Sequence, residues 1–374
     1  MGALDLTVSP APKPVSVLWA LGSRQLRYEL EAMVAMAADR AAMRMLEEQP
    51  FVRQRLAPGP HGVRHVSAED FLAASALHTT APIAGGRGVA DPQLHLHYLL
   101  IGALDTNDQL RALDSRILAN YQAELEAEAT GHLTELLRQR GFEIERRLEQ
   151  RRNGQPRVVW EVKGVPGSLI KAMSSRMTEI AELKTQFMAE YSREPEGPAW
   201  EAWIVKQRGP KAKLTAAELR LEWMEDAAEH AFGPEAVEDL VAAADHRQAA
   251  GIPETNVDSP QPQEFRELLL QHVCQEYAFV PESYLDRLAH QLAVGLIPAS
   301  LVDWVIGRMM ADSELLVTKN DRMITSGSGW TRCRLTTCPR CTPSWWASAA
   351  IKTLSSPASR CAGAQGRSRG MSTG

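Results

Sequence analysis

The chain has 374 residues, 44% of them hydrophobic, which is enough apolar material to bury a core in each of two domains. No apolar run approaches the roughly 20 residues of a membrane-spanning helix, and no secretory signal follows Met1. The composition therefore argues against membrane insertion or export and predicts a cytoplasmic protein.

The formal net charge of −5 hides an uneven distribution along the sequence. Residues 327–374 contain six Arg, one Lys and no acidic residue, which leaves −12 on residues 1–326. Any DNA contact would need a local basic patch, because the chain as a whole has no positive field. Charge alone neither supports nor excludes a nucleic-acid partner.

The first hundred residues predict three strands, a buried segment and a helix. Residues 5–9 are an expected strand, and Val15–Trp19 is a second buried element after a Pro-rich turn. The apolar spacing from Arg24 to Glu48 is helical. Strands follow at 70–79 and, most clearly, at 94–103, where hydrophobic residues alternate between two faces.

Helices dominate the rest of the chain. Asp114 is expected to cap a long helix that ends near Gly141, and residues 142–163 form a hairpin around a turn at 152–155. Further helices are predicted at 166–189, 214–230 and 234–246. After a Pro-rich polar linker, we expect helices at 264–276, 281–293 and 298–311 and strands at 315–318 and 323–325, an order compatible with a winged-helix module.

The tail from Gly327 onward has no apolar periodicity and is rich in Cys, Trp, Ser, Thr and Arg. We expect it to be disordered, and a reading-frame shift near Ser326 would explain the change in composition. Its four cysteines offer a zinc-knuckle alternative, but their spacing and the lack of folded context argue against zinc. They are Cys333, Cys338, Cys341 and Cys361.

Two histidines on the clearest strand are candidates for a metal site. His95 and His97 are two residues apart, so the strand projects both imidazoles to the same side. His78, at the end of the preceding strand, could supply a third ligand. Three imidazoles leave coordination positions open, which is typical of a catalytic rather than a structural metal. Paired histidines also occur in proteins that bind no metal, so the pattern alone is weak evidence for a metal site.

The residues around these histidines resemble a known family. The run from Asp91 to His97 reads Asp-Pro-Gln-Leu-His-Leu-His, and Asp5–Trp19 contains Asp-Leu-Thr-Val-Ser followed by Pro-Lys-Pro-Val-Ser. Both runs are similar to motifs of the TrwC/TraI-type (MobF) conjugative relaxases. Further landmarks are Arg111–Asp114, Trp160–Pro166 and Leu214–Trp223, so the resemblance covers about residues 3–245.

The resemblance implies a DNA-processing site. His78, His95 and His97 would hold a divalent metal ion, Mg or Mn before Zn or others, beneath the scissile phosphate of single-stranded DNA from an origin of transfer. Asp5 matches the family acid that orients a ligand histidine or assists the nucleophile. Lys13 matches a motif lysine and is the best single candidate for a DNA phosphate contact. Conjugation accessory proteins are expected partners.

Three departures from the family pattern bear on activity. The family nucleophile is a tyrosine ahead of the Asp-Leu-Thr motif, and none of Tyr28, Tyr98 and Tyr121 occupies its place, so no nucleophile is assigned. Pro10 resembles an insertion and Pro14 replaces a family serine, which would disturb a central strand. The loop between His78 and His95 is longer than in the family, which makes His78 the least secure ligand.

These observations predict an α+β fold: a relaxase-type antiparallel sheet flanked by helices, incomplete at the N-terminus, followed by the small helical module. The expected parts are a truncated relaxase domain (1–247), a linker (248–263), the winged-helix-like module (264–326) and the tail (327–374). We expect a conjugative relaxase unable to nick alone. The absence of a Gly-x4-Gly-Lys-Ser/Thr loop excludes an ATP-driven helicase.

Three alternatives stay open. A misassigned start codon would make the natural protein an active transesterase. The chain could instead be a non-enzymatic DNA-binding remnant or regulator from a mobile element. The last alternative is nonfunctional debris, which poor folding would favour, since the loss of strands exposes a sheet edge.

Overall fold

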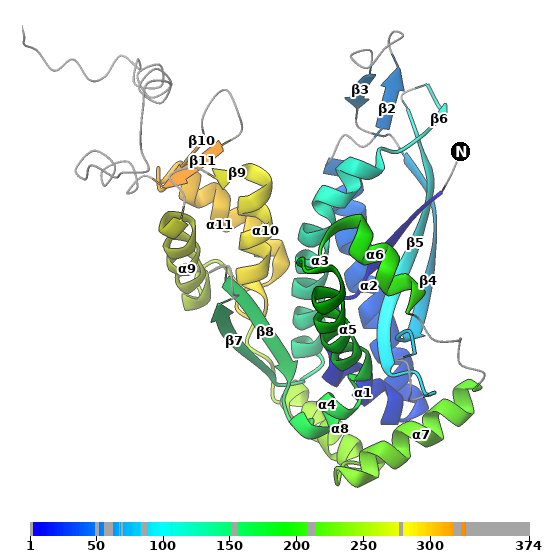
Figure 1. Cartoon of the computed structure of the whole chain (residues 1–374). Coiled ribbons are helices and arrows are strands. Elements are labelled where there is room, and N and C mark those ends of the chain that lie inside the picture. Colours follow the sequence, from blue (N-terminus) through cyan, green and yellow to red (C-terminus); the bar gives the residue numbers. More distant parts are fainter. Residues whose placement is uncertain are drawn as a thin grey trace, which may run out of the picture.

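The computed structural model (Figure 1) describes residues 3–48, 52–55, 63–66, 68, 70–83, 88–105, 107–150, 156–207, 214–276, 280–317 and 323–326. Within these ranges, none of the helices has the length and apolar content needed to cross a bilayer. The tail after Ser326, including its four cysteines, lies outside the described residues.

An antiparallel sheet forms the centre of the N-terminal part. Its order is β1 (Leu4–Val8), β5 (Pro92–Leu104) and β4 (Asp70–Thr80), and β6 (Leu110–Arg111) also pairs with β5. One face packs against α1 (Lys13–Leu21), α2 (Arg24–Glu48) and α3 (Ser115–Gln139), which share one hydrophobic cluster with β1 and β5. The opposite face of β4 is largely exposed. The α+β class and the flanked antiparallel sheet are as predicted.

The second buried element is a helix, so the expected disturbance of a central strand by Pro14 was wrong. Pro14 occupies the first turn of α1, where the missing N–H has no helical acceptor in any case. Every residue from Pro14 to Leu21 is buried. A segment enclosed on all sides shows neither a helical nor a strand period, which is why its sequence did not identify it.

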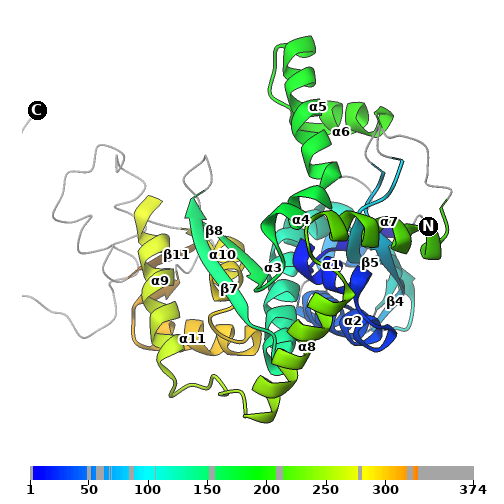
Figure 2. The same cartoon turned by 90° about the horizontal axis from the view of Figure 1, so that it is seen from below.

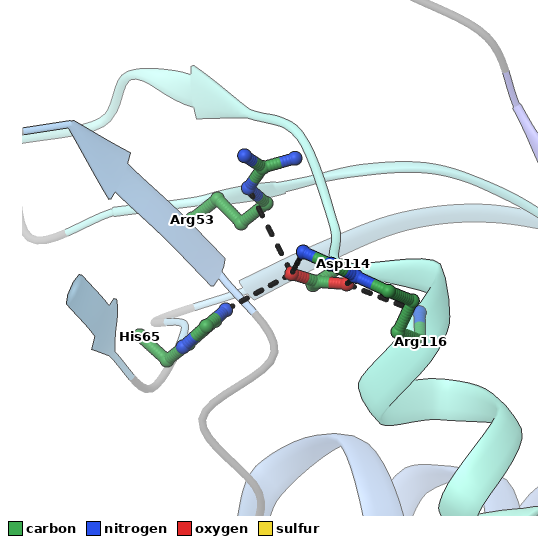
Figure 3. Close-up of polar contacts among 4 residues, drawn as sticks. All are labelled: Arg53, His65, Asp114 and Arg116. Atoms are coloured by element: carbon green, nitrogen blue, oxygen red, sulfur yellow. Dashed lines mark hydrogen bonds and ion pairs between the residues drawn. The ribbon is translucent and has the colours of Figure 1, made fainter. Parts of the chain in front are cut away.

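Asp114 caps α3 as expected, and it also holds a hairpin that the sequence did not indicate. The hairpin pairs β2 (Val52–Arg55) with β3 (Val63–Val66). Asp114 accepts from Arg116 N at 3.0 Å and bonds His65 Nε2 at 3.1 Å, and Arg53 Nε lies 3.8 Å from its carboxylate. Figure 3 shows these three side chains around Asp114. Burial opposes ionisation, but the bonds from His65 and Arg116 outweigh it and lower the pKa of Asp114 to about 2.

The hairpin β7 (Ile144–Gln150) and β8 (Pro156–Val162) confirms the prediction for residues 142–163. The helix expected at 166–189 is two helices, α4 (Gly167–Ala172) and α5 (Ser175–Tyr191), separated by a break at Ser174. A further helix, α6 (Gly197–Lys206), was not predicted. Figure 2 shows α5 extending away from the rest of the protein with α6 beside its outer part.

Two more helices complete the N-terminal part, α7 (Ala216–Glu229) and α8 (Pro234–Ala249). Thr215 and Glu218 form a capping box at the start of α7. Gly141 follows α3 with φ +94° and lies against the backbone of α8. A Cβ at this position would be 2.0 Å from Ala244 O, so only glycine fits.

The C-terminal part has its own hydrophobic cluster. It comprises α9 (Pro260–Glu276), α10 (Glu282–Ala293), α11 (Ala299–Ala311) and a small sheet of order β10 (Leu315–Val317), β11 (Met323–Ser326), β9 (Val280–Pro281). The helices on either side of the predicted linker are longer than expected, which leaves 250–259 between them. The division into domains stays a prediction.

A partly buried polar cluster joins this C-terminal part to α2 and α3. Arg44 donates to Glu128 Oε1 at 3.2 Å and to Asp303 at 2.9 Å, and its Nη1 lies 3.2 Å from His290 Nε2. Glu128 is 4% exposed and His290 2%. Burial lowers the pKa of His290, so its neutral ring can accept a hydrogen bond from the guanidinium.

Candidate metal centre

The sheet brings the three predicted histidines together. His78 on β4 is directly opposite His95 on β5, and His97 follows two residues later on the same face. One ring nitrogen from each histidine can be chosen so that all three lie within 4.8 Å of one another. The ring centroids are 4.4 to 5.4 Å apart. This cluster of His78, His95 and His97 is called the histidine triad below.

Hydrogen bonds orient two of the three rings. His97 Nδ1 lies 2.8 Å from Asp5 Oδ1, and since a carboxylate only accepts, the Nδ1 atom carries the proton. His95 Nδ1 similarly donates to the Gln93 carbonyl at 3.2 Å. In the neutral form of each ring, this tautomer leaves Nε2 without a proton and able to bind a metal ion. Thr7 Oγ1, at 3.3 Å from His97 Nδ1, lies beside the same proton.

The environment of His95 favours its neutral form. Burial lowers the pKa of His95, and the neighbouring rings of His97 and His78 act in the same direction, while the bond to the Gln93 carbonyl opposes them. His95 is 9% exposed, whereas His78 is exposed and His97 is intermediate. A neutral imidazole is the state that coordinates metal, so the donor set fits a metal ion.

Side chains from several elements anchor the segment that enters β5. Lys13 Nζ donates to Pro92 O at 2.9 Å, Leu94 N donates to Ser16 Oγ at 3.1 Å, and Trp223 Nε1 donates to Ala90 O at 2.9 Å. These roles of Ser16 and Trp223 were not predicted from the sequence. Lys13 has two further N–H groups, so its predicted contact with a DNA phosphate is compatible with this bond and stays a prediction.

Glu126 on α3 connects the end of β1 to the start of β5 through Ser9. Both of its carboxylate oxygens lie 3.1 Å from Ser9 N, just after β1, and Ser9 Oγ accepts from Gln93 Nε2. Burial raises the pKa of Glu126 to about 7, against the opposing effect of the Ser9 bond. The strand that carries Asp5 and Thr7 is therefore tied to the strand that carries the histidines.

Two of the tyrosines considered as nucleophiles have hydroxyls engaged elsewhere. Tyr98 lies on the opposite face of β5 from His97 and donates to Asp39 on α2 at 2.7 Å. Burial and this neighbouring carboxylate raise the pKa of Tyr98. The Tyr28 hydroxyl accepts from Arg24 on α2.

Comparisons with known proteins give a family model and several solved structures. The model described as TrwC relaxase matches residues 1–230. A structure of TrwC complexed with a 27-mer DNA comprising the recognition hairpin and the cleavage site is 25% identical; the match covers 62% of this chain and 74% of that chain, with a TM-score of 0.45. A metal-bound structure of the conjugative relaxase TrwC with oriT DNA is 24% identical, with 62% and 72% covered and a TM-score of 0.46.

A third structure of the conjugative relaxase TrwC with oriT DNA, copper-bound, is 25% identical, with 62% and 71% covered and a TM-score of 0.45. The search of curated proteins gives no match. The family model extends over more than half of the chain and includes Asp5, Lys13 and all three histidines. The chain belongs to the TrwC relaxase family.

Proposed function

We propose that the chain is a conjugative relaxase domain that binds single-stranded DNA from an origin of transfer at a metal centre made of His78, His95 and His97. The observation that carries this proposal is the set of three ring nitrogens within 4.8 Å of one another, on an open face of the sheet. An ion held by three imidazoles keeps open positions for a ligand.

The donor set bears on which ion is held. Mg²⁺ prefers oxygen ligands, whereas imidazole suits transition metals. Of the two ions expected from the family resemblance, we therefore favour Mn²⁺. A bound dication at this site would neutralise the charge of a phosphate and polarise its P–O bonds.

The protein's own residues supply orientation. Asp5 and Gln93 fix the tautomers and ring planes of His97 and His95 through their Nδ1 atoms. Next to the triad, Leu99 on β5 is exposed, so bases of a single strand have an apolar surface beside the phosphate site. The face is open to a flexible strand because most residues of β4, including His78, are exposed.

Metal titration of the purified chain tests the proposal. Co²⁺, whose visible absorption reports nitrogen ligands, should bind with one-to-one stoichiometry to the unsubstituted chain. His95→Ala should abolish this signal, whereas His246→Ala, at an exposed position on α8, should leave it unchanged. Equal Co²⁺ binding by the His95→Ala chain would refute the metal centre.

DNA binding and cleavage are measured separately. Anisotropy of a fluorescein-labelled oligothymidylate should show tighter binding with Mn²⁺ than with a chelator, and His95→Ala should remove that difference. Binding that is insensitive to both changes would instead favour a non-enzymatic DNA-binding protein. Denaturing gels of an origin-bearing strand report cleavage, and covalent attachment to the protein would show that the chain carries its own nucleophile.

A further inference from the structure

Asp91 lies where the two histidine strands meet a third element. Its carboxylate is buried, with the residue 3% exposed, and its Oδ2 accepts from Ser175 Oγ at 2.7 Å and from Arg176 N at 3.3 Å, in the first turn of α5. Its backbone carbonyl accepts from Ala81 N at 2.9 Å, one residue after β4 ends. Asp91 thus contacts α5 and the end of β4 directly.

The position of Asp91 in the sequence places it close to the metal site. His95 follows it by four residues along β5, and His78 precedes its backbone partner Ala81 by three residues on β4. Lys13 is the neighbouring cation, bonded to the next carbonyl at Pro92 O. The short connections leave little freedom between the carboxylate and the histidine triad.

The helix α5, whose first turn bonds Asp91, forms with α6 an arm that packs mainly on itself. Phe187 contacts Tyr191, Trp200 and Trp203 with ring centroids 4.8 to 5.4 Å apart. Leu183 and Phe187, the buried residues of α5, belong to neither of the two core clusters, and α6 has no buried residue. Figure 2 shows this α5–α6 arm projecting from the rest of the protein. Its direction therefore depends on how its base is held.

We propose that Asp91 is a positioning residue that fixes the α5–α6 arm to the strand carrying His95 and His97. A buried carboxylate that accepts from a helix N-terminus is stabilised by charge-assisted hydrogen bonds and by the helix dipole. With this cap in place, the arm and the metal centre form one rigid unit before DNA arrives. This role rests on the proposed function, since it makes the arm part of the single-strand binding surface.

Without the cap, the first turn of α5 frays and the arm samples more orientations. Part of the free energy of DNA binding is then spent on ordering the arm, so the affinity for DNA is weaker while the metal ligands are unaltered. The proposal therefore separates two quantities that a general loss of folding would change together: DNA affinity falls, and metal binding stays the same.

Two serines at the start of α5 provide a matched pair of variants. Ser175→Ala removes the hydroxyl that donates to Asp91, whereas Ser174→Ala removes one that donates to Ile170 O. Asp91→Asn tests the carboxylate itself. Amide hydrogen exchange in the full chain should become about tenfold faster in the first two turns of α5 for Ser175→Ala and Asp91→Asn, the size of effect expected from one charge-assisted hydrogen bond. Ser174→Ala should leave these amides unchanged, and the β5 amides should stay protected in all three variants.

The same variants are titrated with Co²⁺ and with the fluorescein-labelled oligothymidylate. For Ser175→Ala we expect an unchanged Co²⁺ spectrum and affinity, and about fivefold weaker binding of the oligonucleotide in Mn²⁺. Unchanged exchange in α5 for both Ser175→Ala and Asp91→Asn would overturn the anchor. Faster exchange with unchanged oligonucleotide affinity would overturn the positioning role.

Failure of the proposed function gives a different result. In that case the unsubstituted chain would bind neither Co²⁺ nor the oligonucleotide, which overturns the positioning role together with the function. Faster exchange of α5 in Ser175→Ala would then still support Asp91 as the anchor of the arm, since hydrogen exchange depends on neither ligand.

Discussion

The buried carboxylate of Glu126 predicts a measurable pH dependence of stability. Burial raises the pKa of Glu126 from 4.5 to about 7 in the folded chain. Between these values the folded state binds a proton that the unfolded state has released, so stability falls as pH rises from about 4.5 to 7. The shift corresponds to a cost of about 3 kcal/mol at pH 8 and under about 1 kcal/mol at pH 5. Glu126→Gln keeps an oxygen acceptor for Ser9 N and removes this cost.

Urea unfolding of the full chain, followed by far-ultraviolet circular dichroism at pH 5 and pH 8, tests this reasoning. Glu126→Gln should raise the free energy of unfolding by up to about 3 kcal/mol at pH 8 and by little at pH 5. Glu222→Gln, at an exposed position on α7, should have no pH-dependent effect. A gain for Glu126→Gln that is equal at the two pH values, or a loss at pH 8, would show that burial does not raise the pKa of Glu126.

Three further predictions follow from single contacts. Asp5→Ala should weaken Co²⁺ binding about tenfold in an absorption titration, because it removes the acceptor that orients the His97 ring; unchanged affinity would contradict this. Gly141→Ala should cost more than about 3 kcal/mol in urea unfolding, since its Cβ clashes at positive φ, whereas Gly167→Ala meets nothing within 4 Å and should be tolerated. Arg44→Met should cost about 3 kcal/mol by leaving the Glu128 carboxylate buried without its cation, and adding Glu128→Gln should recover most of that loss.

Local sequence patterns were sufficient to predict much of the sheet and the grouping of the three histidines. The period of two along β5 places His95 and His97 on one face whatever the rest of the chain does. His78 lies near the end of the strand before it, and antiparallel pairing of two strands joined by one loop brings that end opposite the start of the next strand. The N-cap at Asp114 also followed from a short-range rule, since the capping side chain bonds a backbone N–H two residues away.

The elements that were not predicted were missed for a local reason as well. The β2–β3 hairpin is short, and α6 carries no buried residue that would give it an apolar period. The segment of α1 is buried on every side, so its hydrophobic run looks alike in a helix and in a strand. In each case the pattern from which an element is predicted is absent from the sequence itself.

The sequence by itself determined the strand that carries two of the histidines, the family motifs and the capped long helix, because these depend on neighbours within a few residues. Only the tertiary structure decided the roles of Asp91, Glu126 and Arg44. Their partners Ser175, Ser9 and His290 lie 84, 117 and 246 residues away, respectively. Whether a carboxylate is buried, paired or protonated depends on which distant segments enclose it, and burial of that kind leaves no periodic trace in the chain.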